Sequence, residues 1–185
     1  SFLLIACGMS LNFAGHFVYI LSAPVFLMRH LGVSETGFLW LFVPAMAGTL
    51  TGAWLSGRFA GKYTPRQTLM RAYLVMGLAA LLNLAISFGL PPGLPWSVLP
   101  IMVYSLGLSL ALPSLTLLSL DLFPAQRGMT SSCQMFLQSM FNSLLAGVIV
   151  PILWGSTRFL ALGMTGLFLL GALACGLYLR RSNPS

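Results

Sequence analysis

Three polar side chains recur at helical spacing in the first apolar stretch of this sequence. Asn12, His16 and Tyr19 would fall within an arc of about 60° on a helix of 3.6 residues per turn. Amide, imidazole and phenol groups donate and accept hydrogen bonds, and in an apolar setting each costs free energy unless it has a partner. The chemistry that this arc supports is therefore hydrogen bonding, either to a ligand in a polar cavity or to a neighbouring helix.

A second polar stripe lies near the end of the chain. Gln134, Gln138 and Asn142, with Ser131 one turn before them, would lie within an arc of about 80°. Three amides on one face exceed what simple packing between helices needs, so we expect them to line a cavity shared with the first stretch. Together with a serine from the fourth apolar run, the candidate ligand-contacting residues are Asn12, His16, Tyr19, Ser105, Gln134, Gln138 and Asn142.

Side chains suited to catalysis or metal binding are scarce. The two acids, Glu35 and Asp121, sit at the ends of apolar runs, so this sequence places no carboxylate within a run to relay a proton. His16 and His30 are fourteen residues apart and would lie at different depths, which does not suit a metal centre. There is also no Gly-rich phosphate loop and no nucleophile elbow. We therefore expect no enzymatic activity, no cofactor and no metal.

The composition indicates the solvent in which these residues must be positioned. Of 185 residues, 58% are apolar and only 6% are charged, so a soluble fold would lack the polar residues to cover its surface. The charge-poor runs are long enough to cross a bilayer as helices. The predicted spans are residues 2–28, 36–57, 68–90, 96–120, 128–153 and 158–179. The predicted fold class is an all-α transmembrane six-helix bundle, a single domain over residues 1–185.

The cations predict the orientation of this bundle. The second connector, the fourth connector and the tail hold Arg58, Lys62, Arg66, Arg71, Arg127, Arg180 and Arg181. The other connectors hold only Arg29 and Arg158, and seven against two predicts that the richer side and both chain ends are cytoplasmic. The net charge of +7 therefore reflects membrane orientation, and we expect no nucleic-acid partner.

Three further patterns concern how the spans pack. Gly48, Gly52 and Ser56 recur every four residues, which is typical of close helix packing. Spans three and six have no polar stripe, so we expect them to face lipid. The three cysteines lie within apolar runs and are expected to be buried thiols; they are Cys7, Cys133 and Cys175.

A recurring order of proline and glycine positions favours two inverted three-helix repeats. Pro24 in the first span is followed after a turn by Gly37, and Pro113 in the fourth span is followed by Gly128. Prolines that interrupt the first helix of each triplet are a feature of transporters, because they free backbone carbonyls beside a cavity.

Three segments resemble one branch of a known transporter superfamily. The first segment resembles the F-x-Y-x-x-S-x-P motif and the following G-(L/V)-S turn of the Bcr/CflA drug-efflux branch of the major facilitator superfamily. The matching residues are Phe17, Tyr19, Ser22 and Pro24, then the turn over residues 31–34 and Gly37. The loop with Gly57, Arg58, Lys62 and Arg66 resembles the second copy of the superfamily's basic signature, without its usual Asp. The pattern of Gly128, Ser131, Ser132 and Gln138 resembles the start of helix eleven, although Met135 stands where that branch tends to have a small residue.

The resemblance implies that the six spans correspond to helices seven to twelve of a twelve-span protein in the plasma (bacterial inner) membrane. Because Ser1 opens directly onto an apolar run, we also expect the chain to be a fragment. The implied function is proton-coupled efflux of small amphipathic compounds by alternating access against an N-terminal half. The coupling acid would lie in that half, or His16 would serve. Two alternatives stay open: an importer of sugars or other nutrients from the same superfamily, and a non-transporting six-span scaffold or assembly subunit.

Overall fold

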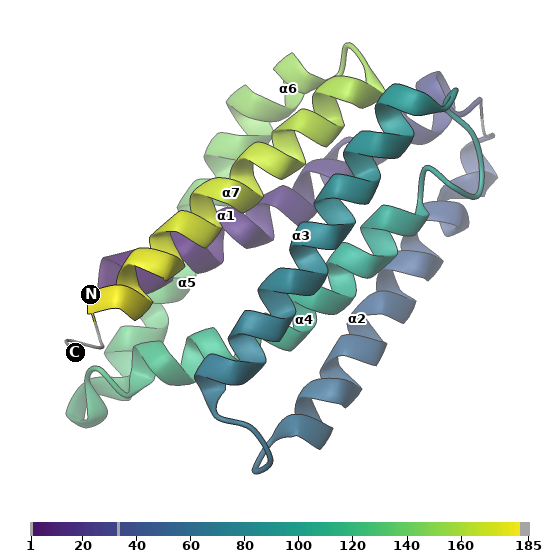
Figure 1. Cartoon of the computed structure of the whole chain (residues 1–185). Helices are drawn as coiled ribbons and strands as arrows, with labels where there is room; N and C mark the ends of the chain where they lie inside the picture. Colours follow the sequence, from purple (N-terminus) through teal and green to yellow (C-terminus); the bar gives the residue numbers. More distant parts are fainter. Residues whose placement is uncertain (1, 33, 182–185) are drawn as a thin grey trace.

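The computed structural model describes residues 2–32 and 34–181, and this part of the chain folds into helices joined by short connectors (Figure 1). Six stretches are long and apolar enough to cross a membrane, which agrees with the predicted number of spans and suggests a multi-pass membrane protein. They are α1 (Phe2–Leu21), α2 (Leu39–Phe59), α3 (Pro65–Gly89), α4 (Leu99–Leu120), the stretch Pro124–Leu153 that contains α5 (Arg127–Leu144) and α6 (Val150–Leu153), and α7 (Thr157–Arg181).

The start of α3 shows how local sequence sets a helix boundary. Thr64 accepts a hydrogen bond from the Gln67 backbone N–H, and the Gln67 side chain accepts one from the Thr64 N–H, both at 3.2 Å. This reciprocal capping box, with Pro65 as the first helical residue, satisfies backbone groups that would otherwise have no partner. Gly61 makes the turn before it with a φ of 78°. The helix therefore begins three residues before the predicted start at residue 68.

Two π-helical segments occur in the described chain, one just beyond the end of α1 and one within the fifth span, and prolines lie beside both. Val25–His30 follows Pro24 at the end of α1, and Leu145–Ile149 precedes Pro151. Pro151 lacks the backbone N–H of the regular helix and its ring presses on the carbonyl of Gly147, four residues earlier, which favours a wider turn there. The same effect of Pro24 falls on the residues before it, so it does not account for Val25–His30. In contrast, α4 runs through Pro113 without a break, so the expectation that this proline interrupts the fourth span is wrong.

α1 and α4 form the interior of the bundle. About half of each is buried, 56% and 50% of the spanning window, whereas only 11% of the fifth span is. α1 packs on α7, α5 and α4, while α4 packs mainly on α2 and α3. The polar arc of α1 consequently has neighbouring helices on several sides. The amide stripe of α5, in contrast, lies in the span with the smallest buried fraction.

The small-residue face of α2 makes the closest helix contact with α4. A Cβ atom added to Gly48 would overlap the Met102 backbone carbonyl, and one added to Gly52 would overlap the Leu106 carbonyl. Both glycines are buried, and only a hydrogen atom fits between the two backbones here. The predicted close-packing face is confirmed.

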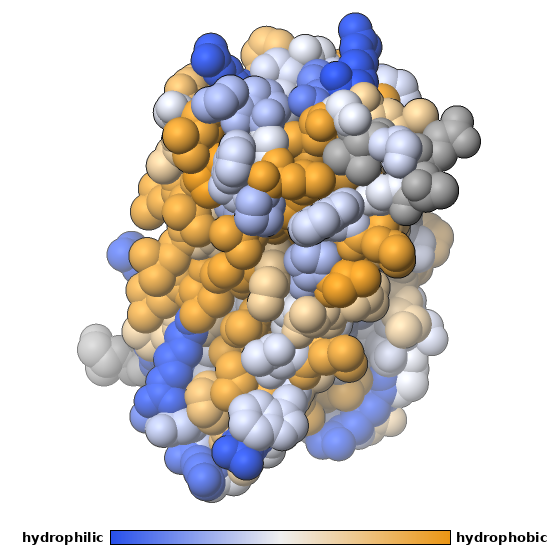
Figure 2. All heavy atoms as spheres, turned by 90° about the vertical axis from the view of Figure 1, so that its right-hand side faces the viewer, coloured by the Kyte–Doolittle hydropathy of each residue, from blue (hydrophilic) through white to orange (hydrophobic). Residues whose placement is uncertain are grey.

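The surface has the distribution of polarity that a bilayer requires. Figure 2 shows mainly hydrophobic residues across the middle of one face and the most hydrophilic ones mainly towards the two ends. The outer faces of α3 and α7 expose large leucines, as expected for lipid contact; these include Leu74, Leu78, Leu81, Leu169, Leu173 and Leu177. The start of α1, the end of α7 and the α2–α3 and α4–α5 connectors lie at one end of the bundle (Figure 1).

Candidate ligand-binding site among the central helices

The structure brings two of the predicted residues together between α1 and α4. The His16 Nδ1 atom lies 3.3 Å from the Ser105 Oγ atom, and His16 is only 7% exposed. The Ser105 hydroxyl donates to the Ile101 carbonyl at 2.7 Å, so the two hydrogen bonds form together when the imidazole N–H donates to Ser105. The imidazole also lies nearly parallel to the Tyr104 ring, at 10° with centroids 6.4 Å apart. His16 therefore has a defined orientation at the α1–α4 contact.

Asn12 faces a different pair of helices. Its Nδ2 atom donates to the Gly8 carbonyl at 2.7 Å and to the Tyr73 hydroxyl of α3 at 2.5 Å. Tyr73 donates in turn to the Cys175 Sγ atom of α7 at 3.0 Å, and Tyr104 donates to the Asn12 backbone oxygen at 3.1 Å. Asn12 thus belongs to a largely buried network that joins α1, α3, α4 and α7.

Tyr19 also turns towards α3. Its hydroxyl accepts a hydrogen bond of 2.8 Å from the Asn83 Nδ2 atom, and both side chains are buried. The prediction that the third span only faces lipid is therefore wrong: its outer face exposes leucines, while its inner face supplies Tyr73 and Asn83 to the polar groups of α1. The arc on α1 is divided between two neighbours because 60° is enough for adjacent side chains to reach different helices.

Gln134 connects α5 to the interior helices. Its Oε1 atom accepts a hydrogen bond of 2.7 Å from the Ser119 hydroxyl of α4, and its Nε2 atom contacts the Met9 sulfur of α1. Gln134 is only 4% exposed. Its amide is thus satisfied by the protein itself.

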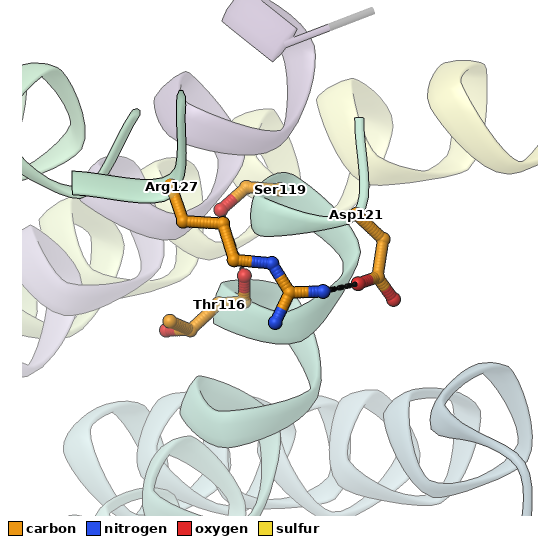
Figure 3. A network of polar contacts seen from close by, with 4 residues as sticks. All are labelled: Thr116, Ser119, Asp121 and Arg127. Carbon is orange, nitrogen blue, oxygen red and sulfur yellow. Dashed lines mark hydrogen bonds and ion pairs between the residues drawn. The ribbon is translucent and has the colours of Figure 1, made fainter. Parts of the chain in front are cut away.

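The α4–α5 connector holds these two helices close to Gln134. Figure 3 shows Arg127, at the start of α5, reaching Asp121 beyond the end of α4, with an ion pair of 3.2 Å. The Ser119 hydroxyl also lies 2.9 Å from the Thr116 carbonyl. Because the ion-pair side chains are 59% and 63% exposed, this pair contributes little stability and mainly orients the connector.

Gln138 and Asn142 differ from the other five predicted residues. Both are half-buried on the stripe that continues from Gln134, and neither side chain makes a hydrogen bond with the described part of the chain. The Asn142 Oδ1 atom is itself buried and has no partner there. Of the seven predicted residues, these two are the ones whose side chains make no hydrogen bond with the described residues, although the Asn12 Oδ1 atom is also buried without a partner.

The predicted residues of the basic loop are all exposed. Arg58 lies 4.0 Å from the centre of the Trp54 ring, and Arg71 lies 3.6 Å from that of Tyr63. The other predicted members of this loop motif, Gly57, Lys62 and Arg66, are exposed as well. Within residues 2–32 and 34–181, the ion pair seen is that of Arg127 with Asp121, so the loop cations face solvent or lipid headgroups.

Sequence reasoning missed Tyr73, Ser119 and Cys175 as members of these networks. Tyr73 lies two residues after Arg71, where a tyrosine usually marks the membrane interface, and a single serine or cysteine in an apolar run carries no positional signal. Cys175 is a buried thiol, as predicted. Cys133 is exposed, so that prediction is wrong there, because α5 has few neighbours in this chain.

Comparisons with protein-family models, with curated proteins and with solved structures find no match for this chain. The class that the structure defines is an all-helical chain, over its described residues, with six helices long and apolar enough to cross a membrane.

Proposed function

We propose that this chain is one half of a secondary active transporter of the major facilitator type, closest to the Bcr/CflA drug-efflux branch. In this proposal it exports small amphipathic compounds by proton-coupled alternating access, and its open side pairs with an N-terminal half. It lies in the bacterial inner membrane with both ends in the cytoplasm, where the cation-rich end of the bundle would be attracted.

The packing pattern supports an inverted-repeat arrangement. If spans one, two and three are matched with spans four, five and six in that order, the contact of α2 with α4 corresponds to the contact of α5 with α1. The contact of α3 with α4 likewise corresponds to that of α7 with α1. Transporters built from inverted triplets have this kind of internal correspondence.

The observation that carries the proposal is the state of Gln138 and Asn142. Both lie near the middle of the fifth span, which is only 11% buried, and they lack partners among the described residues. An amide that faces hydrocarbon without a hydrogen bond costs free energy, whereas an amide that faces a hydrated cavity or a polar ligand does not. A central site completed by another half gives these groups their partners.

The test is export by the full-length protein with Gln138→Ala and with Asn142→Ala. We expect each variant to lower export about fivefold or more at equal surface expression, because a hydrogen bond to a ligand contributes about 1 kcal/mol. Ser139→Ala, an exposed position beside the stripe, is the matched control and should leave export unchanged. Unchanged export in both amide variants would contradict the site.

A non-transporting scaffold has support of its own. Asn12, Tyr19, His16 and Gln134 already bond between helices, which is what a purely structural role requires. The reading frame upstream of Ser1 separates the two functions: six further spans favour the transporter, and a start codon at Ser1 favours the scaffold.

A further inference from the structure

A groove runs along the outside of the bundle between α3 and α7. It has a volume of about 340 Å³ and is lined by Met70, Tyr73, Leu74, Phe168, Ala172, Cys175, Gly176 and Leu179. Apart from the Tyr73 hydroxyl and the Cys175 thiol, which bond to each other, these side chains are apolar. None of the predicted ligand-contacting residues belongs to it. This groove is therefore distinct from the proposed central site.

Contacts at two levels fix the two walls of the groove. At one end of the bundle, the Arg158 side chain donates to the Ser87 carbonyl at 3.4 Å. Nearer the other end, the bond from Tyr73 to Cys175 joins the helices beneath the groove. The groove is open on its outer side because Ala172 and Gly176 have little or no side chain. A Cβ added to Gly176 would meet nothing within 4 Å.

The length of the groove corresponds to one leaflet of a bilayer. Phe168 and Leu179 are separated by eleven residues, which is about 16 Å along a helix. The hydrocarbon core is about 30 Å thick, so the groove reaches from one interface to about the middle. A transmembrane helix of a partner would need a surface over the full thickness, whereas a single acyl chain needs only this half.

Three arginines lie on α3 and α7 near the interfacial end of the groove. Arg180 lines a second hollow of about 300 Å³ that shares Ala172 and Gly176 with the groove. Arg71 follows the lining residue Met70, and Arg181 ends α7. No ion pair with a carboxylate is seen for these arginines in the described part of the chain. The groove is therefore an apolar slot that ends at arginines without a carboxylate partner among the described residues, of which Arg71 stacks on Tyr63.

We propose that this groove binds an anionic phospholipid of the leaflet at the cation-rich end. One acyl chain lies between α3 and α7 over Ala172 and Gly176, and the phosphate lies against Arg180. Anionic headgroups are attracted to juxtamembrane cations by about 1 kcal/mol per residue, and basic pockets between helices are typical sites for them. The inference depends on the six helices crossing a bilayer and does not depend on transport.

The experiment fills the groove and uses a position on the same helix as its control. The full-length protein is reconstituted into bilayers of equal parts phosphatidylcholine and phosphatidylglycerol and extracted in mild detergent, and the retained lipid is quantified by mass spectrometry. Gly176→Leu should abolish the retained phosphatidylglycerol. Gly166→Leu should retain it, because Gly166 is exposed on α7 outside the groove and a Cβ there also meets nothing within 4 Å.

The charged end is tested separately. Arg180→Gln should lower the preference for phosphatidylglycerol over phosphatidylcholine about fivefold, and Arg29→Gln, at the other end of the bundle, should not change it. Thermal unfolding of each variant shows whether it is folded, and the arginine variants keep the proposal testable if a leucine variant is not. The proposal would be overturned if the two leucine variants retained equal amounts of phosphatidylglycerol, or if Arg180→Gln left the lipid preference unchanged. It would also be overturned if Gly176→Leu dissociated a protein dimer while the retained lipid stayed the same.

Discussion

Buried polar side chains determine which helices of this chain lie beside one another. Tyr19 and Asn83 are both buried and share a hydrogen bond of 2.8 Å, and the other side-chain contact of Asn83 is a long one of 3.9 Å to the Met164 sulfur. We expect a double-mutant cycle with Tyr19→Phe and Asn83→Leu to give a coupling of about 0.6 kcal/mol, the average for hydrogen bonds between membrane helices. The measurement is the free energy of unfolding of the four proteins in detergent.

Asn83→Leu combined with Ser119→Ala is the matched control cycle. Ser119 bonds to Gln134 in another part of the bundle, so the two changes should be additive. Zero coupling between Tyr19 and Asn83 would refute the bond. If Tyr19→Phe lowers stability but leaves export unchanged, Tyr19 has a structural role only. Gln138 and Asn142 would then remain the residues expected to contact the ligand.

At the scale of helices, the α2–α4 contact depends on the absence of a side chain at two positions. Gly48→Ala would place a methyl group on the Met102 carbonyl, and backbone atoms cannot move aside as a flexible side chain can. We expect destabilisation of about 1–3 kcal/mol, measured as a lower free energy of unfolding. Gly57→Ala, in the same helix but with nothing within 4 Å of the added atom, should be neutral or slightly stabilising. Equal stability of the two variants would mean that the helices are farther apart than described.

The same helices show what the sequence can predict. Runs without charges predicted six spans, and glycines at four-residue spacing predicted the close face of α2, because both depend on properties of a single helix. The partners of Asn12 and Tyr19 were not predictable, since an arc gives a direction on its own helix but does not identify the neighbour. The early start of α3 was encoded in Thr64-Pro65-Arg66-Gln67, a capping box with proline after the cap, and could have been predicted.

Whether the seven proposed contact residues form one site is a question about the whole molecule. In this chain they are divided among the α1–α3, α1–α4 and α4–α5 contacts, and only Gln138 and Asn142 lack partners among the described residues. If a second half of the protein completes the ligand site, the residues of this half alone do not form a full set of ligand contacts. The central cavity therefore stays a prediction, whereas the close packing of α2 on α4 is confirmed.

The arrangement of charge over the whole bundle predicts its orientation. Helices that alternate in direction place the α2–α3 and α4–α5 connectors at one end (Figure 1), and seven of the nine cations belong to these connectors, to the adjoining ends of α2, α3 and α5 and to the end of α7. Anionic headgroups and the insertion machinery hold such an end in the cytoplasm. Reporter fusions after Lys62 and Arg127 should therefore report the cytoplasm, and fusions after Gly32, Pro92 and Gly155 should report the opposite side.

Removing cations at the α2–α3 connector should weaken this orientation. Replacing Arg58, Lys62 and Arg66 by Gln would reduce the difference in cations between the two ends from seven against two to four against two, and we expect a mixed population of orientations in the Lys62 fusion. If fusions after Gly32 and Lys62 report the same side in the unmodified protein, α2 does not cross the membrane and the six-span topology is wrong.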